Sequence, residues 1–214
     1  MGYRSLAPYV WPIYAPWMAS SLGMSTLLVA LPVWLLGGGH GYVLTSMVAG
    51  AGGAGAAVGA LLVGNLVDRS GPARVAAGSL LLMVVASASM ALIGHVVVLG
   101  LGHLAFGMGS IGVMLSRQAD LTSRIPRYLR GRAMSVMGGS MRLSVLVGTV
   151  AGGALVEVIG GRWTIAAAGL AAAVGLPAVI PTALRPEREV APIGTDLPGL
   201  ATVVRLHHRP LVRV

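Results

Sequence analysis

Two long stretches without a charged side chain constrain this sequence more than any other feature. Ser5 to Val67 contains no Asp, Glu, Lys or Arg over 63 residues, and Val75 to Ser116 contains none over another 42. A helix that crosses a bilayer needs about 20 apolar residues, so each stretch can supply two such helices and the turn between them. A soluble domain could not cover so much apolar surface, and a disordered chain would not carry it. The sequence therefore predicts an all-α, multi-pass integral membrane protein.

The overall composition narrows the expected partners. Of the 214 residues, 56% are hydrophobic and 10% are charged, whereas an ordinary soluble protein has roughly 25% charged residues. The absence of Cys excludes disulfide frameworks and thiolate metal sites. A net charge of +9 would suit nucleic acid, but no basic-aromatic surface accompanies it. We therefore expect a lipid bilayer as partner, and neither nucleic acid, metal nor cofactor.

Hydropathy and turn residues divide the chain into six predicted spans and a polar tail. Pro16 and Pro32 interrupt the first span. The charged segments 68–74 and 117–132 are expected to be loops. Residues 1–184 form the predicted transmembrane domain, and residues 185–214 a cytoplasmic linker or tail. The six predicted spans cover about residues 12–36, 44–66, 75–93, 96–115, 133–159 and 163–181.

The distribution of arginines predicts the orientation. Cytoplasmic segments of membrane proteins carry an excess of basic residues. A cytoplasmic N-terminus places thirteen of the fifteen basic residues on the inner side, with Arg162 outside and Arg142 within a span. Both termini are therefore expected in the cytoplasm, with the chain in an inner or plasma membrane. The thirteen inner residues are Arg4, Arg69, Arg74, Arg117, Arg124, Arg127, Arg130, Arg132, Arg185, Arg188, Arg205, Arg209 and Arg213.

Small residues recur at four-residue spacing in the second and fifth predicted spans. Residues at i and i+4 share one helix face, so a neighbouring backbone can approach such a stripe closely. Packing within the chain would explain one stripe, but two on neighbouring faces of the second span indicate a neighbour beyond the local bundle. The stripes are Gly52, Ala56, Ala60 and Gly64; Ala51, Gly55 and Gly59; and, in the fifth span, Ser144, Gly148 and Gly152.

A short motif lies at the end of the second predicted span and in the loop after it. It consists of Gly64, three residues, Asp68-Arg69, one residue, Gly71 and then the basic residue Arg74. This spacing resembles the signature between the second and third helices of major facilitator superfamily transporters, with Ala73 where a second basic residue is often found. The resemblance implies the N-terminal six-helix half of a twelve-helix fold, arranged as a 3+3 inverted repeat. It also implies a gating latch, although a solvated turn that obeys the charge rule would look similar. The latch residues would be Gly64, Asp68, Arg69, Gly71 and Arg74.

A second match lies in the fifth predicted span. The run from Gly148 to Gly153 resembles the fifth-helix motif of drug exporters in this superfamily, with Thr149 where a Pro is usual. Without that Pro we expect a less kinked helix. Gly148, Gly152 and Gly153 are the predicted helix-packing residues.

Four residues are candidates for a substrate or coupling pathway: His103, Arg117, Asp120 and Arg142. A charge within a span is costly, so Arg142 should face a cavity or a partner, unless it snorkels to the rim. His103 stands where many members of the family have an Arg thought to transfer protons, and imidazole titrates near neutral pH. The alternative is a packed, hydrogen-bonded histidine. Arg117 and Asp120 can pair at i, i+3.

The resemblance implies a secondary active transporter that exports small or amphipathic compounds by alternating access. Its substrate would bind near the midplane between two six-helix halves, of which this chain supplies one and the same or a separate chain the other. The sequence has neither a phosphate-binding loop nor a Ser/His/Asp cluster at membrane depth, so we expect no enzyme. The alternative is a non-transporting protein, either a truncated remnant or a six-helix assembly subunit.

Overall fold

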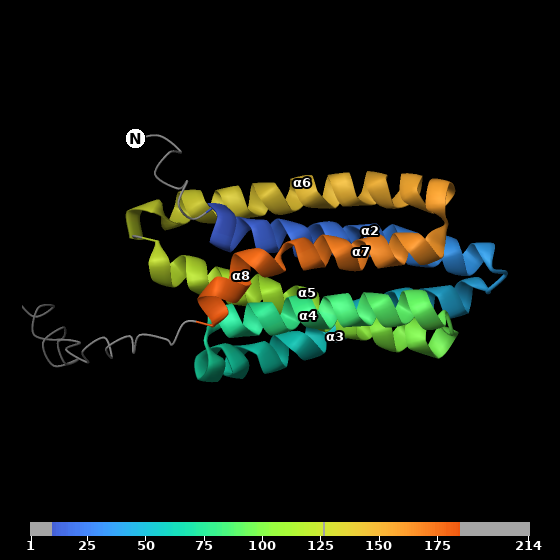
Figure 1. The fold of residues 1–214 in the computed structure, drawn as a ribbon, viewed down its shortest axis with the longest axis horizontal. Coiled ribbons are helices and arrows are strands. Elements are labelled where there is room, and N and C mark those ends of the chain that lie inside the picture. The colour runs from blue at the N-terminus through green and yellow to red at the C-terminus, as the bar shows by residue number, and fades with distance from the viewer. Residues whose placement is uncertain (1–9, 126, 185–214) are drawn as a thin grey trace, which may run out of the picture.

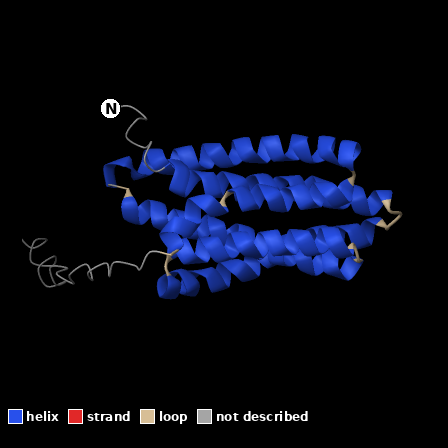
Figure 2. Ribbon diagram, viewed as in Figure 1, coloured by secondary structure: helices blue, strands red, loops and turns tan. Residues whose placement is uncertain are grey.

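The structure is an elongated bundle of antiparallel helices. The computed structural model describes residues 10–125 and 127–184, and helices are the sole regular structure in those ranges (Figures 1 and 2). Five of the helices there are long and apolar enough to cross a membrane, and a bent pair forms a sixth span. The elements are η2 (Val10–Tyr14), α2 (Ala15–Gly37), α3 (Tyr42–Ser70), α4 (Pro72–Ile93), α5 (Val96–Arg124), α6 (Arg127–Ile159), α7 (Gly161–Val174) and α8 (Leu176–Ala183).

Glycine and proline separate the helices in tight turns. Gly71, with φ +77°, joins α3 to α4, and Pro72 then takes the first position of α4, where its missing N–H is not needed. Gly94, with φ +66°, ends α4, and the next residue caps α5, since the Nδ1 atom of His95 accepts a hydrogen bond from the Val97 amide at 3.3 Å. Both turns reverse the chain within a few residues.

The six spans form two groups of three consecutive helices, and helices of one group pack against helices of the other. In chain order, α2, α3 and α4 make the first triplet, and α5, α6 and the α7–α8 pair make the second. Helix α2 packs against α6 and α7, whereas α5 packs against α3 and α4, and α4 also contacts α7 and α8 (Figure 1). The first helix of each triplet thus lies on the second and third helices of the other. Because three crossings separate α2 from α5, these two helices run in opposite directions, as an inverted repeat requires.

Two clusters of buried side chains hold the bundle together. The larger cluster includes Leu31, Met83, Phe106 and Ile165 and joins α2, α4, α5 and α7. A smaller one lies where α2, α5 and α6 meet, at the end of the bundle where α5 continues into α6. It contains Ile13, Tyr14, Trp17, Leu121, Ile125, Ala133 and Met137. Since lipid is as apolar as these side chains, close packing and hydrogen bonds stabilise the contacts more than water exclusion does.

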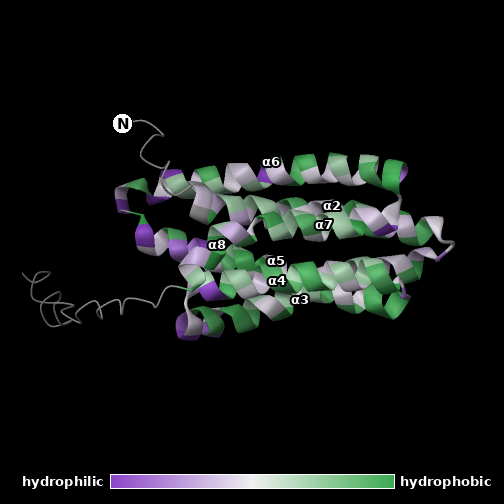
Figure 3. Cartoon of the chain, viewed as in Figure 1, coloured by the Kyte–Doolittle hydropathy of each residue, from purple (hydrophilic) through white to green (hydrophobic). Residues whose placement is uncertain are grey.

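Helices extend into both segments that were expected to be charged loops. Helix α3 continues to Ser70, α5 continues to Arg124, and α6 already begins at Arg127. With 29 residues, α5 is about 43 Å long, and the hydrocarbon core of a bilayer is only about 30 Å thick. The charged turns of these helices therefore project past the apolar layer as helix. Figure 3 shows the hydrophilic residues gathered at this end of the bundle, which we name the arginine-rich end; its described arginines are Arg69, Arg74, Arg117, Arg124, Arg127, Arg130 and Arg132.

The sixth span also differs from a single straight helix. Its two parts, α7 and α8, meet at Gly175 with a bend of 41°. Pro177 cannot donate a backbone hydrogen bond to the preceding turn, which breaks the helix there. The predicted tail, residues 185–214, lies outside the described residues.

Candidate functional site

A charge cluster of buried Arg117, buried Asp120 and exposed Arg124 lies at the arginine-rich end. One guanidinium nitrogen of Arg117 lies 3.0 Å from a carboxylate oxygen of Asp120, and Arg124 pairs with the other oxygen. Arg117 is 0% exposed and Asp120 is 2% exposed. The spacings i, i+3 and i, i+4 put all three side chains on one face of α5, so the helix itself forms the cluster.

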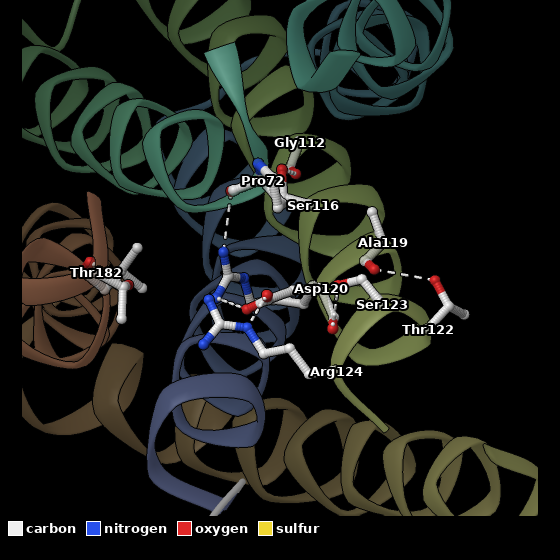
Figure 4. Close-up of polar contacts among 11 residues, drawn as sticks. Pro72, Gly112, Ser116, Ala119, Asp120, Thr122, Ser123, Arg124 and Thr182 are labelled. Carbon is white, nitrogen blue, oxygen red and sulfur yellow. Dashed lines mark hydrogen bonds and ion pairs between the residues drawn. The ribbon is translucent and has the colours of Figure 1, made fainter. Parts of the chain in front are cut away.

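The same cluster reaches across to the turn between α3 and α4. The second terminal nitrogen of Arg117 donates to the carbonyl oxygen of Pro72 at 2.9 Å, and Figure 4 draws this bond as the dashed line that ends at Pro72. Pro72 is the first residue of α4 and lies inside the predicted gating loop. Arg117 therefore joins the end of α5 to the start of α4 while Asp120 neutralises its charge.

The remaining residues of the predicted gating loop lie outside this cluster. Asp68 and Arg69 are exposed on the last turn of α3, and Asp68 forms no ion pair among the described residues. A side chain at Gly64 would meet no atom within 4 Å. Nε of Arg74 donates to the carbonyl oxygen of Ala183 at 3.4 Å, which connects α4 to the end of α8. The loop thus presents the carboxylate of Asp68 and two exposed arginines, Arg69 and Arg74, at the surface.

His103 lies in the contact between α3 and α5, away from the charge cluster. Its Nδ1 atom lies 2.9 Å from the carbonyl oxygen of Val48, which can only accept, so the Nδ1–H group donates. The side chain is 1% exposed, and its Nε2 atom has no hydrogen-bond partner among the described residues. Gly52 leaves the space that the ring fills, since a Cβ there would lie 2.5 Å from Nε2. The ring is a packed, hydrogen-bonded group with one unused nitrogen.

Arg142 lies near the middle of α6, about 22 Å along the helix axis from Arg127. Its side chain is exposed. Two residues turn a helix by about 200°, so Arg142 lies opposite Ser144, which is buried against α2. The structure therefore does not bring Arg142 together with His103, Arg117 or Asp120, and places it on the outer face of the bundle.

The predicted packing glycines of α6 divide between two faces. A Cβ at Gly148 would lie 2.7 Å from the Leu22 carbonyl oxygen, and one at Gly152 would lie 2.9 Å from that of Thr26, so both glycines allow α2 to approach. Gly153 faces open space, with no atom within 4 Å of a built Cβ. Helix α6 runs without a break through Thr149, whose hydroxyl donates to the Val145 carbonyl oxygen at 2.7 Å.

Four side chains of η2 and α2 hold the first span to α6 through hydrogen bonds that sequence reasoning missed. They donate to carbonyl oxygens of α6: Tyr14 to Ala133 at 3.2 Å, Trp17 to Met137 at 3.2 Å, Ser25 to Ser144 at 3.3 Å and Thr26 to Gly148 at 3.2 Å. Polar atoms within a span must find a partner inside the protein. The polar residues of the first span could therefore have predicted hydrogen bonds to a neighbouring helix. The described residues hold no group of three or more His, Asp or Glu side chains that could bind a metal ion.

Comparison with known proteins identifies the family. The family model of the Major Facilitator Superfamily matches residues 7–212. The chain belongs to this superfamily. It is 28% identical over 162 residues, or 75% of its length, to the uncharacterized MFS-type transporter Rv1250 of Mycobacterium tuberculosis. The match covers 28% of that relative, so the chain spans less than a third of its length. The family and the apolar helices make this a multi-pass membrane protein of transporter type.

Proposed function

We propose that this chain forms one six-helix half of a secondary transporter and exports small or amphipathic compounds by alternating access. A second six-helix half, in the same or a separate chain, would supply the other side of the substrate site. In transporters of this kind, the site lies near the midplane between the two halves. Membership in the superfamily supports the class of function, and the outer face of α6 supports the need for a second half.

The position of Arg142 is the observation that carries the proposal. An arginine at the centre of a lipid-facing helix costs about 2.5–3.5 kcal/mol on insertion scales. Arg142 is exposed near the middle of α6, where snorkelling to either rim is longest. Covering this face with protein, or with a water-filled cavity between two halves, removes that cost.

Glycines on the outer faces of α6 and α3 favour close contact with further helices. Gly138 and Gly153 of α6 and Gly50 and Gly53 of α3 each have no atom within 4 Å of a built Cβ. Of the most apolar stretch of each helix, 17% is buried in α6 and 28% in α3, against 56% in α2. Bare backbone on the two least buried helices favours docking of another helical bundle over contact with lipid.

The two ends of the gating loop would then have separate roles. Arg117 and Asp120 hold α5 to the start of α4, whereas Asp68 and Arg69 remain available to the second half. A charge contact that forms in one conformation and breaks in another can bias a rocking motion. His103 has an unused nitrogen that could carry a coupling proton. We place the chain in an inner or plasma membrane, with the arginine-rich end and both termini on the cytoplasmic side.

Cysteine labelling tests the docked faces. Because the chain has no Cys, single substitutions report one site each. In membranes from cells that express the protein naturally, Gly53→Cys and Gly138→Cys should be protected from a lipid-soluble maleimide. Leu170→Cys, on the exposed side of α7, is the control and should react. In the purified chain all three should react. Equal reaction at all three sites in native membranes would favour a non-transporting remnant or assembly subunit.

Transport tests the assigned residues. Once both halves are reconstituted in vesicles, we expect Arg142→Ala and Asp68→Asn each to lower ethidium export about tenfold, equivalent to about 1.4 kcal/mol. Insertion should be unchanged, and Arg142→Lys should retain export. Normal export by both variants would show that Arg142 and Asp68 are not needed for transport. Saturable export by the chain alone would show that no second half is needed.

A further inference from the structure

An apolar groove opens between α3 and α4 at the arginine-rich end. Both helices pack on α5 but make few contacts with each other, which leaves a cavity of about 390 Å³ between them. Its walls are formed by Leu62 and Leu66 on α3 and by Gly78 and Leu82 on α4. A side chain at Gly78 would meet no atom within 4 Å, so this glycine keeps the groove open.

The length of the groove matches one leaflet of a bilayer. It runs along α3 from Gly59 to Ser70, a rise of about 16 Å. The hydrocarbon core of a bilayer is about 30 Å thick, so the groove extends from the rim to about the midplane. An acyl chain from the leaflet at the arginine-rich end is the molecule with this length, chemistry and location.

Polar groups lie at the rim end of the same groove. Ser70 and Arg74 line it there, on either side of the turn between α3 and α4. Arg74 uses Nε for the Ala183 carbonyl, which fixes the side chain beside the groove. Its guanidinium group has further donors suited to a phosphate. Asp68 and Arg69 are neighbouring charges of opposite sign on the last turn of α3 and do not line the groove, so Arg74 is the charged residue that lines it.

We propose that this groove binds an anionic phospholipid. One acyl chain lies between α3 and α4, and Arg74 and Ser70 bind the phosphate of the headgroup. The proposal rests on the membrane-spanning fold and not on transport or its direction. Because the turn that the headgroup would touch also supplies the Pro72 carbonyl to Arg117, lipid binding would fix the position of the gating loop.

A second groove of the same size provides an internal control. It lies between α2, α6 and α7, has a volume of about 410 Å³, and is lined by Met18, Leu22, Leu143 and Val147 among others. Ser144 is its one polar lining residue among the described residues, and no charged residue lines it. This groove can accept an acyl chain but has no group that would select an anionic headgroup.

Native mass spectrometry of the purified chain tests the proposal. Phosphatidylglycerol should bind in preference to phosphatidylcholine with the same acyl chains, by about fivefold for one basic residue near the surface. Arg74→Gln should abolish this preference, and Arg69→Gln, outside the groove, should retain it. Equal binding of the two lipids to the unchanged chain, or equal losses in the two variants, would overturn the proposal.

A second pair of variants tests the acyl-chain part of the site. Gly78→Leu fills the α3–α4 groove and should lower phosphatidylglycerol binding about as much as Arg74→Gln. Ala171→Leu fills the control groove and should leave the preference unchanged. Inorganic phosphate should not displace the lipid. Displacement by phosphate, or full binding to the Gly78→Leu variant, would show a simple anion site and contradict the proposed lipid site.

Discussion

Arg117 and Arg142 show two opposite ways of placing an arginine on a membrane-spanning helix. Arg117 is completely buried, paired with Asp120 and bonded to the carbonyl of Pro72. Arg142 is exposed on the far side of α6 from the bundle. The six-helix bundle satisfies the first charge with its own groups and leaves the second to its surroundings. Internal charges therefore stabilise this half, whereas the external one is suited to an interaction with another molecule.

The largest effect is expected from removing the partner of Arg117. Asp120→Ala leaves a buried guanidinium without its carboxylate and should lower the free energy of unfolding by about 3–5 kcal/mol. Thermal unfolding in detergent measures the change. The exposed Asp68→Ala variant is the control and should change stability by less than about 0.5 kcal/mol. Adding Arg117→Met to Asp120→Ala should restore most of the loss, and failure to do so would show that charge pairing is not the cause.

A smaller effect is expected from glycines on the two faces of α3. A Cβ at Gly55 would lie 1.9 Å from the Leu104 carbonyl oxygen, so Gly55→Val must push α3 away from α5. We expect a loss of about 1–3 kcal/mol in detergent. Gly53→Val adds the same atoms on the outer face, where no atom lies within 4 Å, and should change the stability little. Similar losses in both variants would mean that helix propensity, and not packing, sets the effect.

The smallest effect on stability is expected at Arg142. In the purified chain, Arg142→Ala removes an exposed side chain and should change the unfolding free energy by less than about 0.5 kcal/mol. The same detergent unfolding measurement applies. A loss of unfolding free energy as large as that of Asp120→Ala would show that Arg142 interacts within the bundle. The two arginines would then not differ in the way described above.

The sequence was sufficient to predict the helices but not all of their ends. Charge-free stretches mark where a helix must satisfy its own backbone in lipid, and four of the six spans follow from the two long ones. The charged segments look like loops because hydropathy falls there, yet the ion pairs of Asp120 stabilise further turns of α5 beyond the apolar layer. Charge alone therefore locates the membrane boundary and not the helix boundary.

The side chains of the candidate site were only partly predictable. The spacing of Arg117 and Asp120 is a local property of one helix, so their pairing was foreseeable, and they do pair. The bond from Arg117 to Pro72 joins residues far apart in the chain, and no spacing rule indicates it. The two small-residue stripes of α3 predicted a neighbour beyond the local bundle, but their buried glycines pack on α5 of the same chain, so the prediction was wrong for these glycines. The buried set combines Gly52, Gly55 and Gly59 from two neighbouring stripes.

The acceptor that Arg117 finds in Pro72 is part of the main chain, which every amino acid at that position would also provide. Sequence drift at position 72 cannot remove this oxygen, although it could shift its location. The arginine consequently responds to the path of the peptide backbone and not to the identity of a side chain. Only a change at residue 117 itself, or a displacement of the turn, can break this hydrogen bond. The bond therefore couples α5 to the position of the turn and does not depend on which side chain stands at position 72.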